Sequence, residues 1–124
     1  MIDLTSSVQS IISSNNILSG IVTVFVPGST ASVTTIEYEP GLVKDLPEAM
    51  EKIAPKGAEY QHDLTWGDGN GHSHVRSSII GPGIVVPFQN KKMMLGTWQQ
   101  IVLIDFDNRP RAREIIVQLM GEPA

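Results

Sequence analysis

The chain has its clearest strand signal in Ile21-Val22-Thr23-Val24-Phe25-Val26, a β-branched and aromatic run that Pro27-Gly28 ends. Such residues pack well on a pleated surface, whereas proline and glycine interrupt strand pairing. A second β-rich segment covers residues 32–38 and is closed by Pro40-Gly41. The two segments predict neighbouring strands.

Two helical patterns flank these strands. Apolar residues recur at helical spacing over residues 4–12, and again over residues 42–53, where Pro55 and Gly57 stop the pattern. This spacing places the apolar side chains on one face of a helix. We therefore expect two main helices in the first half of the chain.

The second half of the chain is rich in strand-like segments. They cover residues 74–80, 83–88, 98–106 and 112–119. Trp98 opens one of them, where core or interface packing is the expected role and a stacking platform the alternative. Because the connections are too short for helical crossovers, the sequence predicts an α+β fold. We expect one compact domain over residues 1–124, with a mixed, mostly antiparallel β-sheet.

The composition restricts the chemistry. The 124 residues are 41% hydrophobic, which suffices for a core without disulfides, and they include no cysteine. Thiolate nucleophiles, iron–sulfur clusters and cysteine-type zinc sites are excluded. A formal net charge of −4 disfavours nucleic acid as a partner. No signal peptide and no membrane-spanning run is evident, so we expect a cytoplasmic protein with no membrane partner.

All three histidines fall within thirteen residues, beside a glycine-rich loop. They are His62, His72 and His74. In extended backbone, His72, His74 and Arg76 share one face, and the two histidines stand about 6.5 Å apart along the strand. His62, brought back across the loop, supplies a third imidazole. The pattern predicts a three-histidine metal site.

Such a site with an open fourth position lets zinc polarise a water or a substrate oxygen. Nickel, cobalt or iron also accept imidazoles, but a divalent transition metal, first of all zinc, is the expected cofactor. Asp63 or Glu37 could orient a metal-bound imidazole or act as a base. Arg76 adds positive charge that suits a phosphate or carboxylate. In the alternative interpretation the histidines are loop and interface residues, because His-x-His alone is a weak pattern.

A second charged cluster lies near the C-terminus. Arg109, Arg111 and Arg113 alternate beside Asp105 and Asp107. Such clusters are most often solvated ion pairs, and the alternative is a site that binds an anionic substrate.

The chain resembles the YjbQ-type family, often labelled secondary thiamine-phosphate synthase enzymes, over nearly its whole length. The residues that carry the resemblance are Ser29 to Thr34 with Glu37, Tyr60 to Asp63, His74 to Ser78, and above all Leu95-Gly96-Thr97-Trp98-Gln99-Gln100-Ile101 followed by Arg111 and Arg113. The resemblance implies a compact α+β fold, a metal-binding histidine site, and assembly as a homotrimer or hexamer with sites near subunit boundaries. By position, His62 and His74 match the family's histidines, and Glu37, Asp63 and Arg76 match its other polar positions.

The chain departs from the family at one position. Many members have a histidine where this chain has Gly28, whereas His72 falls where they have none. One hypothesis is that the third metal-binding histidine has moved to His72, which leaves the Pro27-Gly28 position open to substrate.

Three functions remain in view. The resemblance implies weak thiamine-phosphate-forming activity, although a histidine-only site suits magnesium-dependent diphosphate chemistry poorly. Metal-assisted hydrolysis or lyase chemistry on a phosphorylated or carboxylated metabolite fits the predicted site better. The alternative is a non-catalytic oligomeric binding protein that a metal stabilises. We expect a metal-binding enzyme that acts on a small molecule, with Asp63, Glu37 and Arg76 as catalytic residues.

Overall fold

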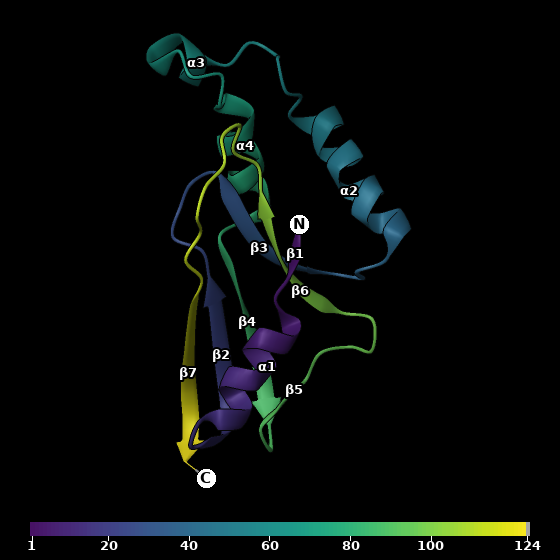
Figure 1. Ribbon diagram of the computed structural model, residues 1–124, viewed down its shortest axis with the longest axis vertical. Helices are drawn as coiled ribbons and strands as arrows, with labels where there is room; N and C mark the ends of the chain where they lie inside the picture. Colours follow the sequence, from purple (N-terminus) through teal and green to yellow (C-terminus); the bar gives the residue numbers. More distant parts are fainter. Residues whose placement is uncertain (124) are drawn as a thin grey trace.

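Two antiparallel sheets form the body of the protein (Figure 1). The computed structural model describes residues 1–123. The three-stranded sheet has the order β1 (Ile2–Asp3), β6 (Gln100–Asp105), β3 (Ala31–Ile36). The four-stranded sheet has the order β5 (Lys92–Met93), β4 (Gly83–Gln89), β2 (Ile17–Phe25), β7 (Ile116–Pro123). Every pairing in both sheets is antiparallel, so the predicted α+β class is confirmed.

The main core lies between the sheets and helix α1 (Thr5–Ser14). Val22 and Val24 of β2 point into it, while Ile21 and Phe25 on either side of the pair are exposed, as strand alternation requires. Helix α1 contributes Val8 and Ile12, both fully buried. Each such side chain contributes about 1.5–3 kcal/mol on burial, so this core stabilises the packing of α1 against the sheets.

Three helices gather at the other end of the molecule: α2 (Pro40–Ile53), α3 (Gln61–Trp66) and α4 (Gly71–Ile80) (Figure 1). Helix α2 begins at Pro40 because the Glu39 carboxylate accepts hydrogen bonds from the backbone N–H groups of Gly41 and Leu42. It stands to one side of the sheets. No helix in residues 1–123 is long and apolar enough to cross a bilayer.

Most of the predicted elements are confirmed, with shifted ends. The predicted helices correspond to α1 and α2, and the strands predicted at 21–26, 32–38, 83–88, 98–106 and 112–119 correspond to β2, β3, β4, β6 and β7. Trp98, however, precedes β6 and is 72% exposed, so it is not a core residue.

The strand predicted at 74–80 is wrong, because these residues belong to α4. The buried face of α4 is made of His72, Ser73 and Ser77, whereas Val75 and Ile79 are exposed. A helix whose buried face is polar does not show the apolar 3.6-residue period by which a helix is recognised in sequence. The described chain therefore has four helices instead of the two main helices expected.

Candidate functional site

Helix α4 is fixed to the three-stranded sheet by two buried serines. The Ser77 hydroxyl donates to the carbonyl oxygen of Ala31 over 2.6 Å, and the Ser73 hydroxyl lies 2.5 Å from the carbonyl oxygen of Phe106. Residues two apart on a helix differ by about 200° in direction. With the serines against the sheet, His72 and Arg76 therefore lie on one flank of α4 and His74 on the other.

This geometry corrects the prediction that His72, His74 and Arg76 share one face. His72 is 3% exposed and lines a cavity together with Arg76. His74 lines a different pocket, with Asp68 and Arg111. The prediction failed because it assumed extended backbone where the chain is helical.

His74 meets His62 of α3. The centroids of the two rings are 4.3 Å apart, and the ring planes are inclined by 38°. The Nδ1 atom of His62 lies 3.4 Å from Oδ1 of Asp63 and 3.5 Å from Oδ1 of Asp68. One side-chain ligand atom from each of His62, Asp63 and Asp68 lies within 4.8 Å of the other two. These four residues form a histidine–carboxylate cluster between α3 and α4.

Backbone contacts hold the two carboxylates in place. Asp63 Oδ1 accepts a hydrogen bond of 2.8 Å from the N–H of Gly71, the first residue of α4. At Gly71 a Cβ atom would lie 2.5 Å from Cβ of Tyr60, so only glycine allows this close approach of the two helices. Asp68 Oδ1 accepts from the N–H of Asn70 over 3.2 Å. The cluster therefore depends on the loop between α3 and α4.

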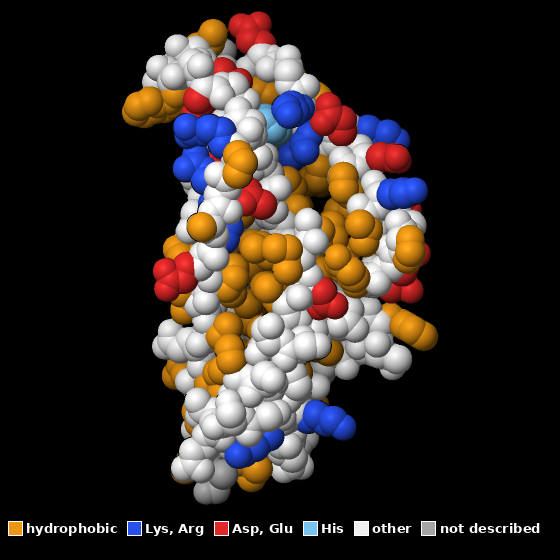
Figure 2. All heavy atoms as spheres, in the orientation of Figure 1, with side chains coloured by type: hydrophobic (Ala, Val, Ile, Leu, Met, Phe, Trp, Pro, Cys, Tyr) orange, Lys and Arg blue, Asp and Glu red, His pale blue; other side chains and the backbone are white. Residues whose placement is uncertain are grey.

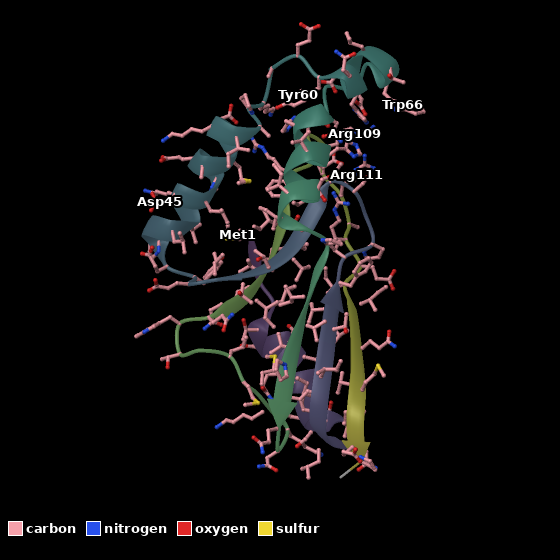
Figure 3. The ribbon with its side chains drawn as sticks, turned by 180° about the vertical axis from the view of Figure 1, so that it is seen from behind. Met1, Asp45, Tyr60, Trp66, Arg109 and Arg111 are labelled. Carbon is pink, nitrogen blue, oxygen red and sulfur yellow. The ribbon has the colours of Figure 1, made fainter. Side chains whose placement is uncertain are left out.

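The arginines after β6 border the cluster. Arg113 makes two hydrogen bonds of 2.9 Å to the Asp105 carboxylate and one of 2.7 Å to the Thr30 hydroxyl. Arg111 donates from Nε to Asp107 over 3.1 Å, and its side chain is 41% exposed. Figure 3 shows Arg109 and Arg111 one above the other beside α4. Arg113 is thus fixed as a structural ion pair, whereas Arg111 presents its remaining nitrogens to solvent.

Asp107 is the buried anchor of this arrangement. Burial by itself would raise the pKa of Asp107, but hydrogen bonds from the Arg109 N–H, the Thr30 hydroxyl, the Asn70 amide and Arg111 outweigh burial and lower it to about 2. Burial also acts to raise the pKa of Asp105, and its hydrogen bonds to Arg113 lower it. Both carboxylates are therefore ionised at neutral pH and hold the two arginines in position.

A pocket of about 270 Å³ connects the histidine–carboxylate cluster to the arginines. Asp68 and His74 line one side, Arg111 and Arg113 the other, and Gly28 contributes to the wall. Gly28 borders this pocket, and a Cβ atom there would lie 2.9 Å from Nη1 of Arg113, so the guanidinium group of Arg113 limits the open space at this position.

Several predicted site residues are thus brought together and others are not. His62, His74 and Asp63 meet, with Arg111 and Arg113 nearby. His72 and Arg76 lie on the opposite flank of α4, so the geometry does not favour His72 as a relocated third imidazole.

Glu37 is also separate from the cluster. It follows β3 at the end remote from Ala31, where it is exposed in a shallow hollow beside Trp98. Asp68 was missed, because Asp68-Gly69-Asn70-Gly71 is typical of a turn. Its position in the same glycine-rich loop as the histidines was the available signal.

The chain is thus a small α+β protein that carries a histidine–carboxylate cluster at the edge of an arginine-lined pocket. A family model described as UPF0047 protein YjbQ-like matches residues 1–122. The chain therefore belongs to the YjbQ/UPF0047 family, as the resemblance of its motifs indicates.

Individual relatives agree with this assignment. A UPF0047 protein of Archaeoglobus fulgidus is 38% identical over 97% of this chain and 90% of its own length, and YugU of Bacillus subtilis is 32% identical over 98% and 89%. A solved YbjQ-like protein of unknown function from Sulfolobus solfataricus superposes with a TM-score of 0.91 at 33% identity, covering 98% of this chain and 86% of that chain. A hypothetical protein from Aeropyrum pernix gives a TM-score of 0.90 at 34% identity, covering 98% and 88%.

Proposed function

We propose that this protein binds a divalent transition metal, zinc first of all, at the histidine–carboxylate cluster, and acts on a small phosphorylated or carboxylated metabolite held by Arg111. The observation that supports the proposal most is the convergence of His62, Asp63 and Asp68 within 4.8 Å, beside a pocket that Arg111 lines. One imidazole with two carboxylates is a donor set that zinc, cobalt and other transition metals accept.

The donor set differs from the three histidines that the sequence predicted, and the residues around it have separate roles. A bound metal would supply Lewis acidity for a substrate oxygen. His74, with its ring against His62, is placed to complete the donor set or to exchange a proton with substrate. Arg111 binds the anionic group of the substrate, while Asp107 fixes the direction of its Nε.

The reaction class that fits these roles is metal-assisted hydrolysis or lyase chemistry. An acidic and imidazole donor set and the exposed guanidinium nitrogens of Arg111 suffice to hold and polarise a monophosphate or a carboxylate. Formation of thiamine phosphate also requires a second substrate and a diphosphate leaving group. It therefore stands as a weaker, secondary activity in this proposal.

Cobalt titration tests the metal site and its link to anion binding. The visible absorption of bound Co²⁺ is expected to saturate near one equivalent in the wild type, to be lost in Asp68→Asn, and to be unchanged in Asp45→Asn, a control on the exposed side of α2. Inorganic phosphate is expected to bind at least about tenfold more tightly with Co²⁺ present, a gain that Arg111→Gln removes. Equal phosphate affinity with and without Co²⁺, or saturable binding that survives Asp68→Asn, contradicts the proposal.

The alternative function is that of a non-catalytic oligomer stabilised by metal. It is favoured by the outer face of the four-stranded sheet, where apolar side chains are each more than a third exposed: Ile21, Phe25, Val85, Ile116 and Met120. Strand register places Ile21 beside Met120 and Phe25 beside Ile116. Contiguous apolar surface of this kind marks interfaces between proteins. In this proposal the face joins copies of the chain into a homotrimer or hexamer.

Light scattering during size-exclusion chromatography separates the two functions. If the metal only ties subunits together, a chelator dissociates the oligomer. If the metal serves chemistry, the oligomer survives the chelator and Met120→Lys dissociates it.

A further inference from the structure

The flank of α4 that carries His72 borders a second cavity, of about 360 Å³, between α2 and the end of β6. Figure 2 shows this region as a hollow with hydrophobic side chains along its walls and lysine or arginine side chains beside a histidine at its upper end. The volume lies in the range of pockets that bind small organic molecules, roughly 300–1,000 Å³.

The walls of the cavity are apolar and come from two elements. Val43, Leu46 and Met50 recur at offsets of three and seven along α2, so they share the face of the helix that looks toward the sheet. Ile104 of β6 and Phe106 form the facing wall. Because α2 stands away from the sheet, these side chains enclose a space instead of meeting in a packed core.

The polar end of the cavity carries an excess of positive charge. Arg76 donates from Nε to the carbonyl oxygen of Ala54 over 2.9 Å and pairs with Glu51 over 2.6 Å. Lys56 also lines this end, and it makes no ion pair within residues 1–123. Two cationic groups thus face one carboxylate, and the buried imidazole of His72 lines the same cavity.

Two other carboxylates reach the cavity, but arginines on the far side of the β6 segment neutralise them. Asp105 is held by Arg113 and Asp107 by Arg111. The uncompensated charge inside the cavity is therefore positive, and it lies next to the part of the cavity that apolar side chains line. A ligand that matches both features has one anionic head and an apolar tail.

We propose that this cavity binds a small organic monocarboxylate, with its carboxylate at Lys56, Arg76 and His72 and its hydrocarbon part between α2 and β6. The site is distinct from the histidine–carboxylate cluster, because His72 and His74 lie on opposite flanks of α4. Arg76 binds the head through Nη1, the guanidinium nitrogen that Ala54 and Glu51 leave free, and Lys56 supplies the unpaired charge.

Three probes test the proposal by amide chemical-shift titration: hexanoate, 1-hexanol, which has the same chain length without the charge, and acetate, which has the carboxylate without the longer chain. Hexanoate is expected to bind at least about fivefold more tightly than either of the others, because only it satisfies both ends of the cavity. Its shifts are expected at Lys56, His72 and Arg76. No binding of hexanoate at 20 mM, on the order of the weakest useful affinity, overturns the proposal, as does equal binding of 1-hexanol.

Two variants and a control locate the site. Lys56→Gln is expected to weaken hexanoate about fivefold and to leave 1-hexanol unchanged, whereas Lys52→Gln, an exposed lysine in the last turn of α2, changes neither. Leu46→Trp is expected to fill the cavity and abolish binding of both probes while the amide spectrum stays folded. A Lys52→Gln effect equal to that of Lys56→Gln overturns the proposal. Asp68→Asn, which tests the metal site, leaves hexanoate binding intact, so the two proposals fail separately.

Discussion

The two flanks of α4 differ in their burial and in the side chains that surround them, although His72 and His74 are only two residues apart. On the His74 flank, imidazoles, carboxylates and arginines surround an open pocket. On the His72 flank, a buried imidazole ends an apolar cavity. The same local sequence, His-x-His, therefore supplies one site with polar donors and another with an apolar wall, because a helix turns alternate residues to opposite sides.

The largest effect is expected from closing the gap between α3 and α4. In Gly71→Ala the new methyl group meets the Tyr60 side chain at 2.5 Å, so α3 must move away from α4. We expect a loss of about 3 kcal/mol of unfolding free energy from the overpacking. We also expect a loss of metal affinity, because the Gly71 N–H no longer holds the Asp63 carboxylate beside His62 and Asp68. Urea denaturation and a zinc titration measure the two effects.

Gly96→Ala provides the matched control for that variant. A Cβ atom at Gly96 has ordinary contacts of 3.6 Å or more, so neither stability nor metal affinity should change beyond about 0.5 kcal/mol. Unaltered zinc affinity in a folded Gly71→Ala protein would show that the approach of α3 to α4 does not create the cluster.

The next effect concerns Asp107, which borders both flanks. Its pKa is lowered to about 2, below the ordinary 3.8, so its ionised form stabilises the fold above pH 4 and this stability is lost as the pH falls toward 2. Asp107→Asn is expected to cost about 2 kcal/mol at pH 7, and to flatten the stability profile between pH 4 and 2. Chemical denaturation at several pH values measures both, and an unchanged acid limb would contradict the assignment of Asp107 as the anchor.

The sequence predicts the strands and part of the histidine–carboxylate cluster, but it does not predict helix α4. The valines of β2 indicate a strand because their burial follows a period of two. His62 and Asp63 can be recognised in the sequence as two adjacent residues that can donate to a metal. Helix α4 is hidden because Ser73 and Ser77 face the sheet, where polar residues are unexpected. The division of the histidines between two sites could not be predicted, since it depends entirely on that helix.

The sequence predicts the roles of Arg111 and Arg113 only in part, because these roles also depend on contacts between distant residues. The alternation of these arginines with Asp105 and Asp107 indicates either ion pairs or an anion site. The structure shows the ion pairs, Arg111 with Asp107 and Arg113 with Asp105, whereas the anion site stays a prediction. Which arginine is fixed depends on Thr30, a contact across 83 residues of chain that spacing does not reveal.

A smaller effect is expected on the pH dependence of stability in metal-free buffer, where substitutions of His72 and His74 should differ. Burial, followed by the charges of Arg76 and Lys56, lowers the pKa of His72 below its ordinary 6.5. The unfolded state therefore binds the proton more readily, so stability is complete above pH 6.5 and falls as the pH drops below it. His72→Gln is expected to remove this decline and His74→Gln to retain it. Thermal unfolding of both variants between pH 7.5 and 5.5 measures this difference. Equal pH dependence of the two unfolding temperatures would contradict the prediction.

In the proposed function, only the His74 flank of α4 holds a metal. The most direct test is zinc content per chain, by plasma mass spectrometry, of untagged wild type, His62→Ala and His72→Ala after incubation with zinc and gel filtration. We predict close to one zinc per chain in the wild type and in His72→Ala, and less than about a tenth of that in His62→Ala. A metal-free wild type, or a folded His72→Ala protein that loses zinc as completely as His62→Ala, would contradict the claim.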